Sequence, residues 1–250
     1  MNNLDQEQQR AVRWLSSEAG ASFLAAEQQL LEQRLQDCFG VHLLQCSIVD
    51  GLDLYNSSPV NHCFKLAPRA TELSERAAVA QFDELPLEDN SIDVVLLHHV
   101  MEFSADPHAL LREIARVVRP EGRILVMVFN PWSMLHLRQV VAHRFNINAW
   151  RCQNIGGHRV ADWLRLLNFN INQTDYCWYG PRLRGSRLAK IGRPLHFMLR
   201  PFGGAALVTA TKRSASLIPI RKRWRELSPG LVVPVVKPSP RAAMEKHNKL

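Results

Sequence analysis

The sequence predicts an α/β protein whose core is a mostly parallel sheet covered by helices. Residues 92–98 and 123–129 are apolar at nearly every position, which is typical of parallel strands that are covered on both faces. Residues 106–118 between them carry an apolar stripe at helical spacing, with Asp106 suited to the N-cap and Pro107 to the first helical position. A strand, helix and strand of this length predict a right-handed βαβ crossover.

The other elements follow from hydrophobic spacing along the chain. Residues 4–16 form one predicted helix, and Ser22 caps a second whose apolar face includes Leu24, Leu31, Leu35 and Phe39 and which ends at Gly40. Further helices are expected at 134–143 and 158–167, and further strands at 41–49, 61–66, 77–82, 169–178 and 205–211. We therefore expect an N-terminal helical segment over residues 1–40, one domain over 41–212 and a flexible tail over 213–250.

Charge is distributed unevenly along the 250 residues. Residues 1–180 carry 15 basic and 21 acidic side chains, whereas residues 181–250 carry 16 basic and 2 acidic ones. A basic segment of this kind is attracted to nucleic acids and other polyanions through counterion release, and it equally fits a tail that is only solvated. Residues 181–250 are therefore a candidate partner-binding region.

Several function classes are disfavoured by composition. The first ten residues are polar and partly acidic, unlike a secretory signal, and the longest apolar runs are far shorter than the ~20 residues that span a bilayer. The five cysteines are odd in number and contain no CxxC pair, so we expect a cytoplasmic protein that is not integral to a membrane. His136, His143 and His158 lack the spacing of a metal cluster, and no metal is expected.

An ordered set of short motifs runs through residues 84–131. It comprises a Leu85-Pro86 turn, an acidic loop, Asp93 at the start of a strand, His98 and His99 at its end, a helix, and an Arg-Pro-x-Gly turn at residues 119–122 before the next strand. This set resembles the second half of class I methyltransferases that use S-adenosylmethionine, and more narrowly an uncharacterised bacterial branch of the methyltransferase type 11 kind. The resemblance implies a Rossmann-like, doubly wound sheet of seven strands with an antiparallel last strand. It also implies S-adenosylmethionine as cofactor and transfer of a methyl group to an unidentified acceptor.

The cofactor motif of this family matches the chain only in part. The family has a D/E-x-G-x-G-x-G turn after its first strand, where Gln45 takes the acidic position and Ser47, Val49 and Gly51 take the glycine positions. The acid that ends the second strand and accepts hydrogen bonds from the ribose is replaced by a strand end containing Lys65. The resemblance also places Gln81 and Phe82 beside the adenine. The candidate cofactor-binding residues are therefore Gln45, Ser47, Gly51, Lys65, Gln81, Phe82 and His98.

Candidate catalytic and substrate-binding residues lie at the ends of the fourth and fifth strands. Methyl transfer depends mainly on alignment of the nucleophile with the methyl group, and a general base is optional. His98 or His99 could supply that base. If the strand continues through His99, alternation predicts that the two rings point to opposite sides, so that at most one faces the cleft. Asn130 and Trp132 follow the fifth strand on the same rim, where acceptors enter. Both assignments have a structural alternative. Each histidine could simply hydrogen-bond to a loop, and Asn130 and Trp132 could belong to a turn that starts the next helix.

The partial glycine motif leaves two functions open. The chain is either a methyltransferase with altered cofactor contacts or a catalytically inactive methyltransferase-fold module that binds an acidic partner or nucleic acid through residues 181–250. A nicotinamide-dependent enzyme is disfavoured, because no GxGxxG motif opens the first helix.

Overall fold

The computed structural model describes residues 3–49, 51–67, 77–79, 84–144, 150–178 and 202–214. The chain divides into a unit over Met1–Ala215 and a second over Ser216–Leu250. The second unit lies outside the described residues, and so does the stretch 179–201. The predicted tail therefore stays a prediction, and the described helices and strands all belong to the first unit.

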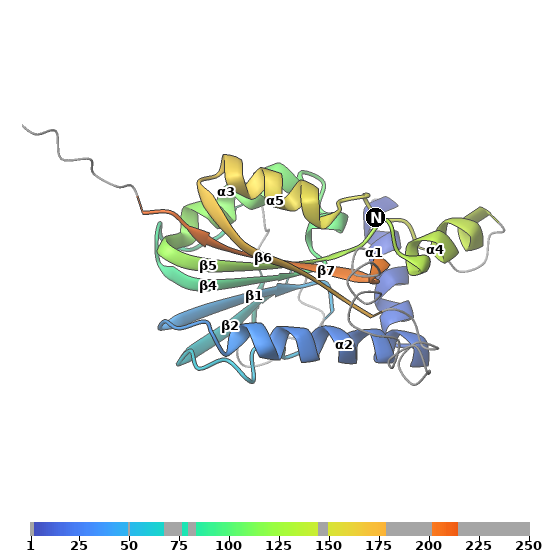
Figure 1. Ribbon diagram of the computed structural model, residues 1–250, viewed down its shortest axis with the longest axis horizontal. Coiled ribbons are helices and arrows are strands. Elements are labelled where there is room, and N and C mark those ends of the chain that lie inside the picture. The colour runs from blue at the N-terminus through green and yellow to red at the C-terminus, as the bar shows by residue number, and fades with distance from the viewer. Residues whose placement is uncertain are drawn as a thin grey trace, which may run out of the picture. The chain divides into compact units, whose positions relative to one another are not determined.

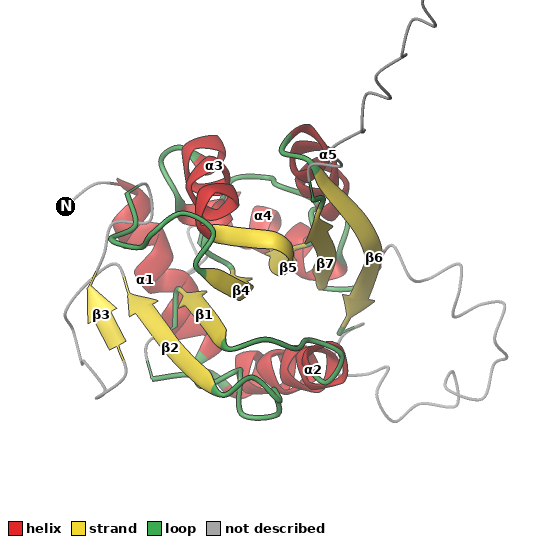
Figure 2. Ribbon diagram, turned by 90° about the vertical axis from the view of Figure 1, so that its left-hand side faces the viewer, coloured by secondary structure: helices red, strands yellow, loops and turns green. Residues whose placement is uncertain are grey.

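One mixed sheet organises this unit (Figure 1), with the strand order β3-β2-β1-β4-β5-β7-β6, which can be followed in Figure 2. The strands are β1 (His42–Ser47), β2 (His62–Ala67), β3 (Ala77–Val79), β4 (Ile92–His98), β5 (Val118–Phe129), β6 (Phe169–Cys177) and β7 (Ala205–Lys212). Strands β1 to β5 pair in parallel, and β7 is antiparallel to both β5 and β6. The strand order reverses between β1 and β4, so the switch point of a Rossmann-like fold lies there.

Helices cover both faces of the sheet, as the apolar pattern of β4 and β5 predicts. The helices are α1 (Asn3–Leu15), α2 (Glu18–Leu35), α3 (Pro107–Val117), α4 (Met134–Arg144) and α5 (Gly157–Leu166), with a short 3-10 helix η1 (Met101–Phe103) after β4. Figure 2 shows α2 on one side of the sheet and α3 and α5 on the other. Residues 94–97 and 124–128 are buried in consequence. Within the described residues, no helix is both long and apolar enough to cross a membrane.

Helix α3 confirms the start that its local signals predict. The carboxylate of Asp106 accepts hydrogen bonds from the backbone N–H groups of His108 and Ala109, both at 2.9 Å, and Pro107 stands at the first helical position. The predicted apolar stripe faces the sheet, with Leu110, Leu111 and Ile114 buried. This βαβ unit fixes where β4 and β5 end, and therefore where the candidate site lies.

The predicted start of the second helix is wrong. Helix α2 begins at Glu18, because Ser17 is its N-cap and accepts a hydrogen bond from Gly20. Gly20 permits close contact with α1, since a Cβ there would lie 2.1 Å from the carbonyl oxygen of Trp14. The helix also ends earlier than predicted, at Leu35, and Phe39 lies outside it with 74% of its surface exposed.

The connection from β1 to β2 contains no helix in its described residues. It spans residues 48–61, of which all but position 50 are described, and these form turns and extended backbone. Parallel strands are commonly joined through a crossover helix. The carboxyl end of β1 is followed by a loop instead. This difference bears directly on the cofactor prediction.

Candidate functional site

Strands β1 and β4 end side by side at the switch point of the sheet, where open α/β proteins bind ligands. Their last residues, Ser47 and His98, are paired in the parallel register. The Ser47 hydroxyl lies 2.9 Å from Nδ1 of His98 and also accepts a hydrogen bond from the backbone of Val49. Ser47 is therefore already engaged on both sides at the place of the family's first glycine.

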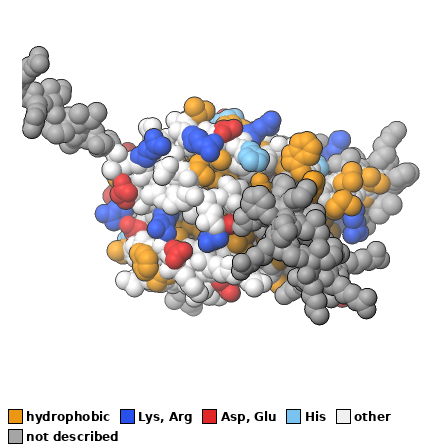
Figure 3. All heavy atoms as spheres, viewed as in Figure 1, with side chains coloured by type: hydrophobic (Ala, Val, Ile, Leu, Met, Phe, Trp, Pro, Cys, Tyr) orange, Lys and Arg blue, Asp and Glu red, His pale blue; other side chains and the backbone are white. Residues whose placement is uncertain are grey.

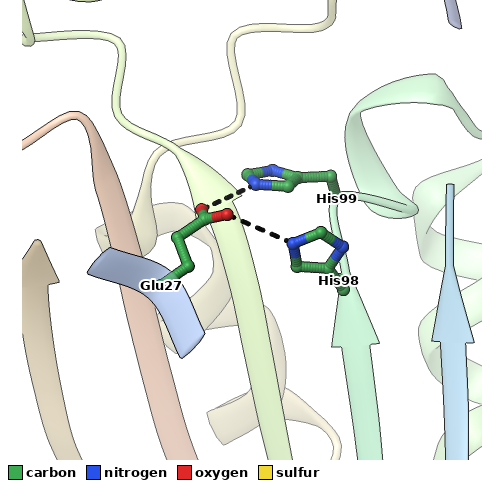
Figure 4. A group of neighbouring side chains, drawn as sticks. All are labelled: Glu27, His98 and His99. Carbon is green, nitrogen blue, oxygen red and sulfur yellow. Dashed lines mark hydrogen bonds and ion pairs between the residues drawn. The ribbon is translucent and has the colours of Figure 1, made fainter. Parts of the chain in front are cut away.

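Both histidines at the end of β4 contact one carboxylate, which comes from α2 (Figure 4). Glu27 lies 3.2 Å from Nε2 of His98 through one oxygen and 2.8 Å from Nε2 of His99 through the other. All three side chains are fully buried. The prediction that the two rings point to opposite sides is wrong, because His99 has φ +56° and has left the extended backbone of the strand.

A second carboxylate holds the outer face of His99. Nδ1 of this ring lies 3.1 Å from Oε1 of Glu102 in η1, and the same oxygen accepts a 2.6 Å hydrogen bond from the backbone of Phe129. The imidazole also stacks on the Phe129 ring, with centroids 3.7 Å apart. A buried hydrogen-bonded chain thus runs through Ser47, His98, Glu27, His99 and Glu102 and joins β1, β4, α2 and η1.

Burial and neighbouring charges act in opposite directions on this chain. Burial alone lowers the pKa of His99, but the charge of Glu27 and the hydrogen bonds to Glu102 and Glu27 raise it to about 9. For His98, burial and the neighbouring His99 charge lower the pKa. Burial opposes ionisation of Glu27, yet both histidines together lower the pKa of its carboxyl group. The Glu27–His99 pair is therefore ionised at neutral pH, and His98 is neutral.

The residues at the carboxyl end of β1 do not form a glycine cradle. The buried Gln45 amide donates to the carbonyl oxygen of Leu52 at 2.6 Å and accepts from the N–H of Leu54 at 3.0 Å. Gly51 is exposed with φ +72°, and a Cβ there would meet nothing within 4 Å. Of the three candidates on this turn, Gln45 and Ser47 make internal contacts and Gly51 borders open space. S-adenosylmethionine does not fit here as it does in the family's glycine turn.

An acidic side chain nevertheless lies at this edge of the sheet. Lys65 on β2 forms an ion pair with Asp53, which comes from the loop after β1. The Asp53 side chain is 44% exposed and so can accept further hydrogen bonds. As an exposed acceptor, the Asp53 carboxylate fits the ribose hydroxyls of S-adenosylmethionine, which would donate to it. Gln81 and Phe82, the candidates for the adenine, lie outside the described residues.

The candidate substrate residues Asn130 and Trp132 line a pocket of about 520 Å³. Asn130 is buried, its amide donates to the carbonyl oxygen of Gly203 at 2.7 Å, and its own oxygen accepts from the N–H of Trp132. The Trp132 side chain is 77% exposed. The other lining residues come from the start of α5, the end of β6 and the start of β7, and they include His158, Arg159, Tyr176 and Phe202.

Exposed apolar side chains continue from this pocket onto α4. Trp132, Met134, Leu137 and Val141 are all about half exposed or more. Figure 3 shows hydrophobic side chains gathered at the end of the molecule that α4 forms. The pocket therefore opens beside an apolar surface.

Three of these residues were missed from the sequence: Glu27, Asp53 and Glu102. A signal for Glu27 exists, since it lies four residues from both Phe23 and Leu31 and so falls on the buried stripe of α2. A carboxylate on an apolar stripe indicates a buried partner. Asp53 and Glu102 carry no such local signal, because a loop and a 3-10 helix have no buried face that can be predicted from spacing.

Of the basic segment at residues 181–250, only residues 202–214 are described. Most of its basic residues lie outside the described part of the chain, and the nucleic-acid prediction remains untested.

Comparison with known proteins finds similarity to methyltransferases over part of the chain. Residues 41–126 match the family described as a methyltransferase domain. An uncharacterised protein of Escherichia coli, YafS, is 27% identical over 198 residues, which cover 79% of each chain. A probable S-adenosylmethionine-dependent methyltransferase of Mycobacterium tuberculosis is 32% identical over 157 residues, covering 62% of this chain and 53% of that protein.

Solved structures share the fold at low sequence identity. A Thermotoga maritima protein described as an S-adenosylmethionine-dependent methyltransferase, possible histamine N-methyltransferase, superposes with a TM-score of 0.56 at 16% identity. The superposition covers 83% of this chain and all of that one. An S-adenosylmethionine-dependent methyltransferase of Archaeoglobus fulgidus gives 0.51 at 15% identity over 74% of this chain and 94% of that one.

Proposed function

We propose that this chain, whose residues 41–126 match a methyltransferase domain, is a class I methyltransferase that uses S-adenosylmethionine to methylate a small molecule bound in the pocket beside Trp132. One observation carries the proposal. The pocket lies where β5 and β6 end, on the same carboxyl edge of the sheet as the switch point between β1 and β4, and open α/β sheets bind their ligands at this edge. The family match and the relatives named as methyltransferases favour this function over a catalytically inactive binding module.

The size and lining of the pocket favour a small acceptor with an aromatic or apolar body. A volume of about 520 Å³ is within the range of small-molecule sites. Trp132, Tyr176 and Phe202 supply aromatic surface, and Arg159 supplies a cation at the rim. Aromatic walls bury apolar area and orient a flat ligand, whereas the guanidinium favours an acceptor that carries an anionic group.

When bound, S-adenosylmethionine supplies an electrophilic methyl group. We assign Asp53 to its ribose hydroxyls, in place of the missing acid at the end of β2, with Lys65 holding the Asp53 carboxylate in position. Gly51, Gln81 and Phe82 remain proposed contacts of the cofactor, whereas His98 is fully buried and engaged on both ring nitrogens.

The acceptor's nucleophile needs alignment, and an oxygen or nitrogen nucleophile also has a proton to lose. The nitrogens of His98 and His99 are all engaged by Ser47, Glu27 and Glu102 in a buried chain, so these rings act as positioning residues in this proposal. His158 lines the pocket and is exposed, so its imidazole is available to receive the proton.

Two measurements test the proposal separately for the donor and the acceptor. Titration calorimetry with S-adenosylhomocysteine should show binding, and Asp53→Asn should weaken it about 10-fold or more, as expected for a lost charged hydrogen bond. The matched control is Asp162→Asn, an exposed carboxylate paired with Arg165 on α5, and it should leave the affinity unchanged. No binding of S-adenosylhomocysteine or S-adenosylmethionine would refute the donor assignment.

Acceptor binding is tested by methyl transfer from radiolabelled S-adenosylmethionine into a cell extract that is then separated into small molecules, protein and RNA. Label in the small-molecule fraction, reduced by Trp132→Ala without a change in affinity for S-adenosylhomocysteine, supports the proposal. Label confined to protein or RNA would refute the small-molecule acceptor and leave the donor assignment standing.

A further inference from the structure

Glu27, His98 and His99 present three metal-binding atoms to one buried point. Each residue offers one ligand atom, and the carboxylate oxygen and two imidazole nitrogens lie within 4.8 Å of one another. They come from the middle of α2 and the end of β4, 71 residues apart in the chain, and Figure 4 shows them converging. Two imidazoles and one carboxylate form a ligand set that binds zinc and related ions in proteins.

The Nδ1 atom of each imidazole, which points away from Glu27, contacts a polar side chain, as is common in metal sites. A ligating histidine usually gives its second ring nitrogen to a carboxylate or another polar group, which fixes the ring and its tautomer. Here Nδ1 of His99 lies 3.1 Å from Glu102, and Nδ1 of His98 lies 2.9 Å from the Ser47 hydroxyl. Both Nε2 atoms are thereby turned toward Glu27, where an ion would replace the present hydrogen bonds.

The charge of the cluster also favours a cation. Glu27 and Glu102 are two fully buried carboxylates, and within the described part of the chain no lysine or arginine contacts either. The cation that they share is the protonated His99, and a metal ion at its Nε2 would replace that proton. The second oxygen of Glu102 is buried and has no hydrogen-bond partner among the described residues. Such an oxygen is costly without compensation, and a dication nearby compensates it.

We propose that Glu27, His98 and His99 bind one divalent transition-metal ion, zinc or a close relative, at the junction of α2 and β4. Nitrogen ligands favour such ions over magnesium and calcium, which prefer oxygen. The bound ion fastens α2 to β4, and through Glu102 it also braces η1 and the end of β5. Its test is separate from that of the methyl-transfer proposal, since the metal site uses none of Asp53, Trp132 and His158.

Because the three ligands are fully buried, the ion enters as the chain folds. The test therefore begins with the full chain unfolded in denaturant with a chelator, then refolded with no metal, with Zn²⁺ or with Co²⁺, and dialysed. Metal content is measured by mass spectrometry of the elements, and the Co²⁺ form by its visible absorption. We expect about one equivalent per chain, a higher melting temperature of the Zn²⁺ form, and Co²⁺ bands indicating nitrogen and oxygen ligands.

Variants identify the ligands. Glu27→Gln keeps the side-chain shape, and His99→Gln replaces the ring with a neutral polar side chain. Each removes a strong ligand and should lose the retained ion. Glu102→Gln removes only the support of His99, and it should weaken Zn²⁺ binding by about 10- to 100-fold. The matched control is His62→Gln, because His42 and His62 form an exposed pair on β1 and β2 that also could hold a metal. This variant should retain the ion.

Three outcomes would overturn the proposal. They are wild-type protein that refolds without retaining Zn²⁺ or Co²⁺, retention that Glu27→Gln and His99→Gln leave intact, and loss of the ion in His62→Gln. Should a ligand variant fail to fold, as judged by circular dichroism, the wild-type stoichiometry and the Co²⁺ spectrum decide the matter, because absorption without nitrogen ligation would itself refute the site.

Discussion

Replacing Gln45 with leucine should lower the free energy of unfolding by roughly 1–3 kcal/mol. Gln45 is buried, and its amide closes the helix-free loop after β1 by bonding the carbonyl of Leu52 and the N–H of Leu54. The unpaired, buried N–H of Leu54 costs about 1–3 kcal/mol, and the half-buried carbonyl of Leu52, which water can reach, costs about 1 kcal/mol. Burial of the leucine side chain offsets about 1 kcal/mol of this.

The assay is denaturant unfolding followed by circular dichroism, with the midpoint and slope measured separately. For a domain of this size the melting temperature should also fall by about 3–10 °C. The control is Gln33→Leu on the exposed side of α2, which should change stability by no more than about 0.5 kcal/mol.

Gln45→Glu sharpens the test, because it restores the residue type found in the family's cofactor motif. Its carboxylate can still accept from Leu54, but its second oxygen would face the Leu52 carbonyl oxygen where the 2.6 Å hydrogen bond now lies. We expect a larger loss than for leucine. A Gln45→Glu variant as stable as the wild type would refute the conclusion that the two hydrogen bonds of Gln45 stabilise this loop.

Two further substitutions test contacts that position the sheet and its helices. Asp93 accepts hydrogen bonds from two backbone N–H groups at the start of β1 and forms an ion pair with Arg119. Burial alone raises the pKa of the Asp93 carboxyl group, but these contacts together lower it. Its contribution is therefore complete above the unfolded pKa of about 3.9 and lost as the pH falls through the lower folded value. At pH 7 the free energy of unfolding of Asp93→Asn should be about 1 kcal/mol lower than that of the wild type. Denaturant titrations should show this difference narrowing below pH 4, and a difference that widens there would contradict the assignment. Gly20→Ala should cost roughly 1–3 kcal/mol despite alanine's better helix propensity, because the new Cβ would lie 2.1 Å from the Trp14 carbonyl oxygen; a more stable variant in the same unfolding assay would show that α1 and α2 can separate freely.

Elements with complete local signals could be predicted well from the sequence. Helix α3 has its cap, its proline and its apolar stripe within 13 residues, and the structure confirms all three. The start of helix α2 could not be predicted in the same way, because Ser17 and Ser22 both suit an N-cap. The choice between them depends on the close packing of Gly20 against α1, which is a tertiary contact.

The candidate site could be predicted only in outline. The edge of the sheet and the residues His98, His99, Asn130 and Trp132 followed from where strands end, and the structure places Asn130 and Trp132 together on one pocket. The partners of the histidines did not follow. Glu27 is 71 residues away from His98, and the turn of His99 to φ +56° overrides the alternation expected of a strand.

The sequence by itself determined the class of fold and the succession of helices and strands along the chain. It could do so because periodicity, caps and turn residues act over a few neighbouring positions. Only the tertiary structure decided that Gln45 hydrogen-bonds across the loop after β1, that Asp53 pairs with Lys65, and that two histidines share one buried carboxylate. These pairings depend on which segments, far apart in the sequence, pack together in the water-free interior. A buried polar group without a partner costs free energy there, so such groups are found in pairs.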